Sequence, residues 1–177
     1  MDTKEFWKLI DDARTLVVDP ADARAVAGRM AALLAQRPAD DILAAQQLLW
    51  DLMAVSYRAP LWAAAYTVNG GCSDDGFDYF RAWLIAQGRE VFERVVADPD
   101  ALASLPVVRA AAAEGADLEC ERVLGVAWDA YQEATGEQLP PASFTIDYPA
   151  LDPDWGFDFD DADQIAQRLP RLDALYG

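Results

Sequence analysis

Apolar residues recur at helical spacing along most of the chain. In the first segment they lie on one helical face, at Phe6, Leu9 and Ile10. This spacing predicts a first helix that begins near Thr3, a candidate N-cap. The same periodicity, punctuated by proline and glycine, continues to about residue 135 and predicts several further helices.

Proline, glycine and small capping residues divide this region into separate helices. The pair Asp19-Pro20 is typical of a cap followed by a first-turn proline, and it predicts the start of the second helix. A third helix, from about residue 40, becomes apolar over most of its circumference and is the candidate central helix. The remaining helical segments are expected to start near Pro60, Ser73, Pro99, Pro106 and Asp117, the last of them running to Thr135, and Gly88 interrupts or bends the pattern that follows Ser73.

The character of the sequence changes after Gly136. Apolar residues at Phe144, Ile146 and Tyr148 alternate with polar ones, which indicates an extended segment that could include one short strand. Residues 152–163 then combine six aspartates with three aromatic residues, and an amphipathic stretch closes the chain.

These patterns together predict an all-α fold. We expect a single-domain, irregular bundle of about seven to nine helices with an extended acidic C-terminal strap. Residues 1–135 are expected to form the helical core, and residues 136–177 an acidic, aromatic strap and a terminal helix packed on that core within the same domain. The chain shows no internal repeat and no linker long enough to separate two domains.

Composition restricts the function. The chain has 177 residues, with 31 acidic against 14 basic side chains, a formal net charge of -17, an isoelectric point near 4.1 and no histidine. Binding to nucleic acid phosphates or anionic lipids depends on Lys and Arg, so direct nucleic-acid binding and membrane contact are not expected. Without histidine the chain has no Ser-His or Cys-His nucleophile pair and no imidazole metal site. Because the chain is strongly acidic, a macromolecular partner is expected to be a basic protein.

The acidic excess is concentrated in one part of the chain. Residues 110–167 contain 14 acidic side chains and one basic side chain, a net of -13. Such a block is either a solvated face or a field that attracts a basic partner or cation. Trp155 and Phe157 lie within it, and they either staple the C-terminal segment to the helical body or form a binding rim. No metal site is predicted, because the acidic spacing from Asp152 onward departs from that of an EF-hand.

Residues 69–84 are the segment most typical of a binding site. Glycines precede a helix start there, where free N–H groups favour anions, but the lysine of a phosphate loop is missing. Asp78 and Arg81 share one helical face, which allows a carboxylate–arginine cluster or a partial metal site. Capping by Ser73 and an Asp78–Arg81 ion pair explain the same residues without any function. The candidate binding residues in this segment are Cys72, Ser73, Asp74, Asp75, Asp78, Arg81 and Trp83.

No catalytic residue and no cofactor are predicted. Cys72 has no histidine to activate it and has two carboxylates nearby, so it is a poor nucleophile. Cys72 and Cys120 are expected to be reduced thiols, since two cysteines are too few for a disulfide framework. The N-terminus lacks the pattern of a secretory signal, and the longest nearly uncharged run is too short to span a bilayer, so a cytoplasmic protein is expected.

Several motifs in the first part of the chain resemble a known family. They read Phe6-Trp7-Lys8-Leu9-Ile10-Asp11, then Gly71-Cys72-Ser73-Asp74-Asp75-Gly76-Phe77 followed by Tyr79-Phe80-Arg81-Ala82-Trp83-Leu84-Ile85, and Gly88-Arg89-Glu90-Val91-Phe92. This set resembles a bacterial family catalogued only as a domain of unknown function, from the first helix to about Tyr131. The resemblance implies a stand-alone bacterial cytosolic protein, and the family suggests no activity for it. It also directs attention to the patch from Cys72 to Trp83.

Two functions are compatible with these observations. The first is a non-catalytic interaction or regulatory module whose acidic face meets a basic macromolecular partner, as a nucleic-acid mimic would. The second is a small-molecule or metal-dependent enzyme with a carboxylate–arginine site in residues 69–84, in which Arg81 clamps an anion. The enzyme requires a concave site that joins these residues to acidic groups from residues 117–163. The sequence carries no prediction of the oligomeric state.

Overall fold

The protein is built from helices alone. A computed structural model describes all 177 residues and contains ten α-helices and four short 3₁₀ helices, with no strand. The all-α prediction is confirmed, whereas the prediction of about seven to nine helices is too low. None of the helices has the length and apolar character needed to cross a membrane. In chain order the elements are α1 (Thr3–Thr15), α2 (Ala23–Leu34), α3 (Ala39–Val55), α4 (Ala59–Asn69), α5 (Asp74–Ala86), α6 (Arg89–Ala97), η1 (Pro99–Ser104), α7 (Pro106–Glu114), η2 (Glu121–Gly125), α8 (Val126–Thr135), η3 (Pro141–Ser143), η4 (Pro153–Trp155), α9 (Ala162–Arg168) and α10 (Pro170–Tyr176).

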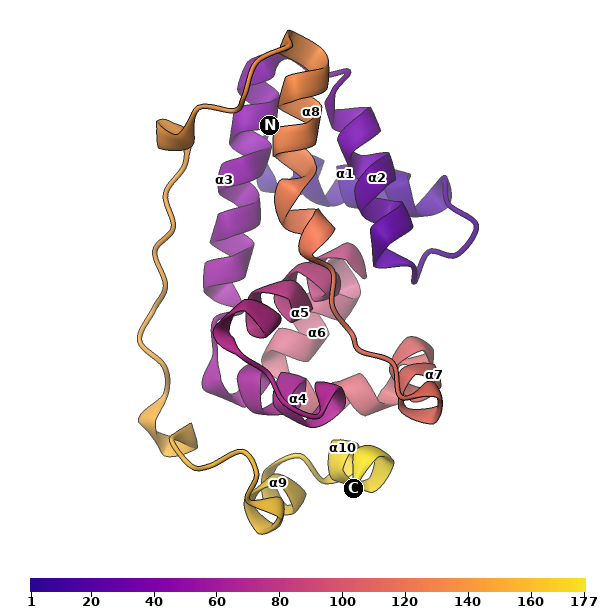
Figure 1. Cartoon of the computed structure of the whole chain (residues 1–177), viewed down its shortest axis with the longest axis vertical. Coiled ribbons are helices and arrows are strands. Elements are labelled where there is room, and N and C mark those ends of the chain that lie inside the picture. The colour runs from indigo at the N-terminus through magenta and orange to yellow at the C-terminus, as the bar shows by residue number, and fades with distance from the viewer.

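The helices form two groups that share one core. In Figure 1, α1, α2, α3 and α8 occupy one end of the molecule, and α4, α5, α6, α7 and α10 occupy the other. Helices α3 and α8 lie side by side, and the C-terminal end of α3 reaches α5 in the second group. A single cluster of 45 buried residues runs through both groups. It includes Leu139, Ile165, Leu169 and Leu172, so residues beyond the last long helix contribute to the same core.

Local capping chemistry determines where α1 and α5 begin. Ser73 accepts a hydrogen bond from the Gly76 N–H at 3.1 Å and caps α5, which confirms the predicted start of that helix. Helix α1 is capped by Asp2 and not by Thr3. Asp2 and Glu5 form a capping box, in which each carboxylate accepts a hydrogen bond from the other residue's N–H.

Helix α2 begins later than the sequence predicts. Its cap is Asp22, whose carboxylate accepts a hydrogen bond from the Ala25 N–H at 3.0 Å. The pair Asp19-Pro20 lies in the preceding turn, where the Asp19 carboxylate accepts from the Ala21 N–H at 2.8 Å. Both aspartates satisfy local N–H groups, and only the second one leads into a helix.

The predicted helix over residues 117–135 is wrong in its first half, where extended chain and η2 precede α8. The Leu118 N–H donates to Asn69 Oδ1 at 2.9 Å, and the Cys120 N–H donates to the Tyr79 carbonyl at 3.0 Å. These partners lie far away in the sequence. Their hydrogen bonds satisfy N–H groups that would otherwise bond within a helix, so the tertiary structure overrides the local periodicity.

Residues 136–161 cross the molecule outside the long helices, and we call them the crossing segment. It leaves α8, passes along α3 and reaches α9 at the opposite end of the molecule (Figure 1). The alternation that allowed a short strand produces none. Phe144 and Tyr148 are half-buried against aromatic side chains of the helical body, whereas Ile146 is 51% exposed.

The amphipathic stretch after the crossing segment forms two helices, and this division adds to the helix number. Pro170 has no N–H to donate, and it disfavours a helical conformation in the residue before it. Leu169 accordingly has φ -130° and ψ 54°, which ends α9 and allows α10 to start with Pro170 in its first turn.

Candidate functional site: an acidic groove on α3, α5 and α8

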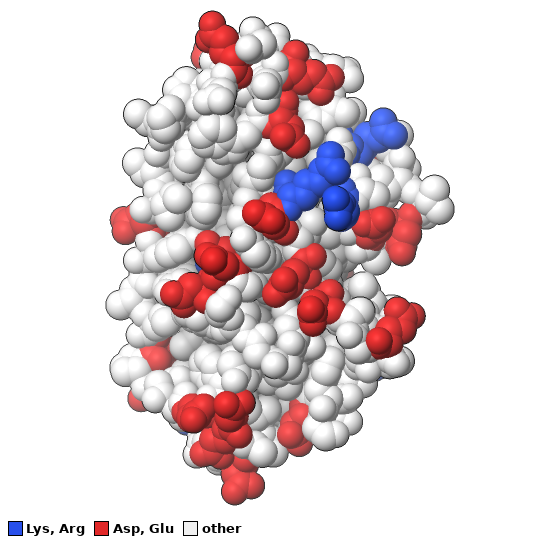
Figure 2. Space-filling view, viewed as in Figure 1, with Lys and Arg blue, Asp and Glu red and all other residues white.

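A groove of about 1000 Å³ opens where the two helix groups meet. Its walls come from α2, α3, α5, η2 and α8, and one edge comes from the crossing segment. Figure 2 shows acidic side chains spread across the middle of the face seen in Figure 1, with basic side chains gathered to one side. The groove thus joins residues of the 69–84 segment to residues of the acidic block.

Carboxylates outnumber basic groups in the groove. Two arginines, Arg24 and Arg122, line it together with five carboxylates, those of Asp75, Asp78, Glu119, Glu121 and Asp129. Burial raises the pKa of Asp78 and of Glu119 above their ordinary values. A concave surface with this excess of negative charge attracts cations. No three thiol or carboxylate side chains of the protein lie close enough together to hold a metal ion.

Aromatic rings cover one part of the groove. The rings of Trp50 and Phe144 are parallel to within 5°, with centroids 6.2 Å apart. Trp128 meets Phe144 edge to face at 6.4 Å. All three side chains line the groove, and the faces of indole rings bind cations and planar groups.

Two buried polar atoms beside these rings have no hydrogen-bond partner. They are Oε1 of Gln46, a residue 1% exposed, and Nε1 of Trp50. Both residues line the groove from α3. A buried donor or acceptor without a partner costs about 1–3 kcal/mol, so the groove contains two hydrogen-bonding groups whose cost the protein alone does not offset.

The loop before α5 mainly serves to start that helix. Asp74 and Asp75 lie in the first turn after the Ser73 cap, where acidic side chains complement the helix dipole. Asp75 also lines the groove. Cys72 lies outside the groove, and burial, aided by the nearby Glu119 carboxylate, raises the pKa of its thiol to about 12. The thiol is therefore protonated at neutral pH.

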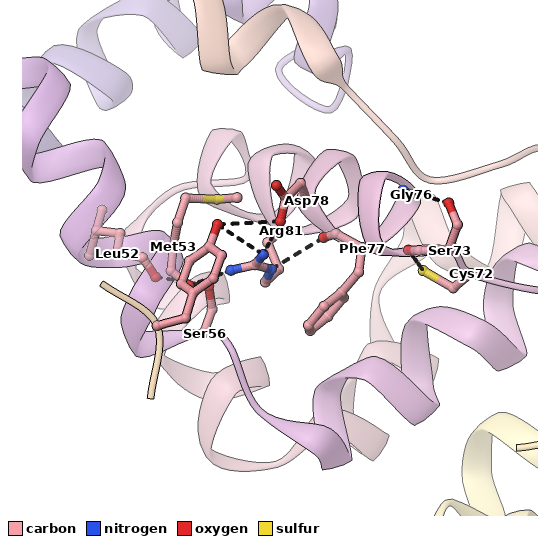
Figure 3. A network of polar contacts seen from close by, with 10 residues as sticks. Leu52, Met53, Ser56, Cys72, Ser73, Gly76, Phe77, Asp78 and Arg81 are labelled. Atoms are coloured by element: carbon pink, nitrogen blue, oxygen red, sulfur yellow. Dashed lines mark hydrogen bonds and ion pairs between the residues drawn. The ribbon is translucent and has the colours of Figure 1, made fainter. Parts of the chain in front are cut away.

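Arg81 is completely buried and holds neighbouring elements together (Figure 3). Its guanidinium donates to the carbonyl oxygens of Met53, at 2.5 Å, and Phe77, at 3.3 Å, and forms an ion pair with Asp78. It also donates to the Tyr148 hydroxyl at 3.3 Å and lies 4.9 Å from the centroid of that ring. These contacts occupy the guanidinium, so Arg81 is not free to clamp an anion as the enzyme hypothesis requires.

Trp83, Trp155 and Phe157 lie away from the groove. Trp83 is 4% exposed and packs against Phe80 in the core at 5.6 Å. The rings of Trp155 and Phe157 are 5.9 Å apart, and the Arg168 guanidinium lies over them at 4.9 and 5.0 Å. Both rings are also partly buried against the hydrophobic core, which is the contact that the stapling alternative describes, and neither ring lines the groove.

Several groove residues were not identified from the sequence. Trp50 and Trp128 fall within predicted helices, and Gln46 lies on the candidate central helix without any motif around it. Glu119 and Glu121 were recognised only as part of the acidic block. One sequence signal could have identified Gln46: it is a polar residue on the apolar face of α3, beside Ile42 and Leu49.

Most of the chain matches a known protein family. No curated protein and no solved structure matches the chain. Residues 1–133 match the family described as "Protein of unknown function (DUF4240)". This span contains every groove residue named above except Phe144. The chain therefore belongs to the DUF4240 family, in agreement with the resemblance of its motifs to a domain of unknown function.

Proposed function

We propose that this protein is a non-catalytic interaction module that binds a basic segment of a partner protein in the acidic groove. The observation that carries the proposal is the composition of the groove. Carboxylates, aromatic rings and two residues that carry unpartnered buried polar atoms line the same concavity. Such a surface can attract a cationic chain, pack against its aliphatic or planar parts and form directional hydrogen bonds with it.

The overall charge supports a basic partner. A formal net charge of -17 repels nucleic acids and anionic membranes and accelerates encounters with cationic proteins. The carboxylates that line the groove continue this field into the binding surface. A cytoplasmic location belongs to the same proposal, and the two free cysteines, Cys72 and Cys120, support it.

The enzyme hypothesis is the second candidate, and one observation favours it. The groove joins Asp75 and Asp78 to Glu119, Glu121 and Asp129, which is the concave site that this hypothesis requires. The structural use of Arg81 weighs against it, because a guanidinium that is already bonded to Met53, Phe77 and Asp78 cannot serve as the anion clamp. We therefore place binding first.

A titration with basic peptides tests the proposal. Short peptides that alternate glycine with lysine or arginine would be titrated into the full-length protein by calorimetry at low and at high salt. We expect binding at low salt that weakens strongly at high salt, because the carboxylates of the groove are partly exposed. Absence of binding at low salt would contradict the proposed function.

A matched pair of variants locates the binding site. Glu121→Gln with Asp129→Asn removes two charges from the groove wall, and we expect the affinity to fall by about tenfold. Glu133→Gln with Asp163→Asn removes two exposed charges outside the groove and should leave the affinity nearly unchanged. Equal losses in the two variants would show that net charge, and not the groove, determines binding.

A further inference from the structure

Two residues on one face of α3 line the groove and carry a buried polar atom without a partner, in one case an acceptor and in the other a donor. Gln46 Oε1 and Trp50 Nε1 are four residues apart on the helix, and both are buried without a partner. A small cavity of about 10 Å³ adjoins Gln46, but all its other lining side chains are apolar. A water molecule there would lack the second polar partner that a buried water needs. This small cavity therefore supplies no partner for the unpaired acceptor.

Phe144 of the crossing segment covers this part of α3. Its ring lies parallel to Trp50 and meets Trp128 edge to face. A phenyl ring fills the space between two indoles, yet it has no polar atom to offer to Gln46 or Trp50. Phe144 thus packs against the aromatic rings of this surface and leaves Gln46 Oε1 and Trp50 Nε1 without hydrogen-bond partners.

The next residue shows that α3 holds an extended main chain at this point. Gln47 Oε1 accepts a hydrogen bond from the Thr145 N–H at 2.8 Å, and Gln47 Nε2 donates to the Thr145 carbonyl at 3.2 Å. One side-chain amide therefore pairs with both main-chain groups of a single residue. The Thr145 hydroxyl adds only a longer contact to Gln47 Oε1, at 3.5 Å. The two main-chain hydrogen bonds require no particular side chain, so α3 can hold another extended peptide through the same bonds.

We propose that the ligand of the groove is an extended peptide segment of a partner protein that carries arginine and displaces Phe144 and its neighbours from α3. The guanidinium stacks on the indole rings that Phe144 vacates and donates to Gln46 Oε1 and to the carboxylates of the groove, and a peptide carbonyl accepts from Trp50 Nε1. This inference rests on the proposed function and specifies its ligand.

Arginine fits this surface better than lysine or a free polyamine. A guanidinium is planar, stacks on aromatic faces, is weakly hydrated and has five N–H donors for several acceptors at once. An ammonium is strongly hydrated, so it loses more when it reaches the buried acceptor of Gln46. A polyamine has no carbonyl for Trp50 Nε1. A peptide that contains arginine supplies both the donors and the acceptor.

Titration with matched ligands separates this inference from the proposed function. Calorimetry would compare the full-length protein's affinity for the glycine–arginine peptide, the glycine–lysine peptide and spermidine at one ionic strength. We expect the arginine peptide to bind at least about tenfold more tightly than the other two. Equal binding of the two peptides would overturn the inference and leave the proposed function intact, whereas binding of neither would remove both. Spermidine binding as tight as that of the arginine peptide would overturn the assignment of a peptide ligand.

Substitutions at Gln46 and Phe144 test the contacts themselves. Gln46→Met keeps the side-chain length and removes the unpartnered acceptor, so we expect a higher melting temperature and a loss of most of the arginine preference. A lower melting temperature or an unchanged preference would contradict the role of Gln46. Phe144→Ala is expected to raise the arginine-peptide affinity severalfold, because it removes the segment that competes for α3. The control Phe159→Ala, in the same crossing segment, should leave the affinity unchanged, and a weaker affinity of Phe144→Ala would overturn the displacement.

Discussion

The guanidinium of Arg81 connects three parts of the chain. Helix α5 carries it, the Met53 carbonyl near the end of α3 accepts from it, and Tyr148 of the crossing segment covers it. Tyr148 in turn stacks on Tyr57 with ring centroids 4.4 Å apart. A buried charge is tolerated only when several partners replace its water, and here a carboxylate, two carbonyl oxygens and aromatic faces do so.

Removal of this guanidinium is expected to be severely destabilising. Arg81→Met leaves the Asp78 carboxylate without its ion pair and the Met53 carbonyl without its donor, and we expect a loss of about 3–5 kcal/mol in the free energy of unfolding. Urea titration monitored by circular dichroism measures it. Arg89→Met removes an exposed arginine paired with Glu93 and should cost less than about 1 kcal/mol. Similar losses of unfolding free energy for the two variants would show that the buried contacts of Arg81 do not stabilise the fold more than an exposed ion pair does.

At the scale of elements, a distant carboxylate secures the C-terminal helix. Asp100 of η1 is 5% exposed and accepts hydrogen bonds from the N–H groups of Arg171, at 3.1 Å, and Leu172, at 2.9 Å. It also accepts from Arg171 Nε at 2.9 Å. A helix as short as α10 is unstable by itself, so its position depends on such tertiary contacts.

Loss of the Asp100 carboxylate should release the C-terminal helices. Asp100→Ala leaves two N–H groups at the start of α10 unsatisfied, and we expect a loss of about 1–3 kcal/mol and faster proteolysis after α9. Urea unfolding and limited trypsin digestion measure these effects. Asp98→Ala is the matched control, because it removes only an exposed ion pair with Arg171. An Asp100→Ala variant as stable as Asp98→Ala would contradict the capping role.

Helix prediction succeeded where the determinants are local. The Ser73 cap and the periodic apolar residues that follow it place the start of α5 correctly, since both act within a few residues. The prediction failed around Leu118 and Cys120, whose N–H groups bond to Asn69 and Tyr79. Those contacts arise only when α4 and α5 have already packed beside this stretch, and no local pattern records them.

At the scale of the whole molecule, negative charge and burial act together. The chain carries a formal charge of -17, and the groove gathers several carboxylates on one face. Burial, together with the nearby Asp117 charge, raises the pKa of Glu119 above its ordinary value, and burial raises that of Asp78. A carboxyl group whose pKa is higher in the folded state binds protons more readily when the protein is folded. Its contribution to stability therefore falls as the pH rises from the pKa of the unfolded state to the pKa of the folded state.

The pH dependence of stability should therefore report on Glu119. At neutral pH the charged carboxylate opposes folding, but Glu119 is largely exposed and solvent screens its charge, so we expect Glu119→Gln to raise the melting temperature by only about 1 °C or less. Below about pH 3 the carboxyl is protonated in both states, and the difference from the wild type should disappear. Thermal unfolding across this pH range measures the effect. Glu137→Gln removes the same charge from a position outside the groove, and an identical pH profile for the two variants would contradict a specific role of the groove surroundings at Glu119.

The sequence alone determined the all-α class, the local excess of acid and the absence of histidine chemistry, because helical periodicity and composition are properties of neighbouring residues and of residue counts. The tertiary structure decided that Arg81 is enclosed and that Gln46 and Trp50 of α3 share a groove with carboxylates from α5, η2 and α8. These groups are separated by tens of residues along the chain. They come together only when whole helices pack against one another. That packing depends on all the contacts of the chain at once, and no short motif in the sequence records it.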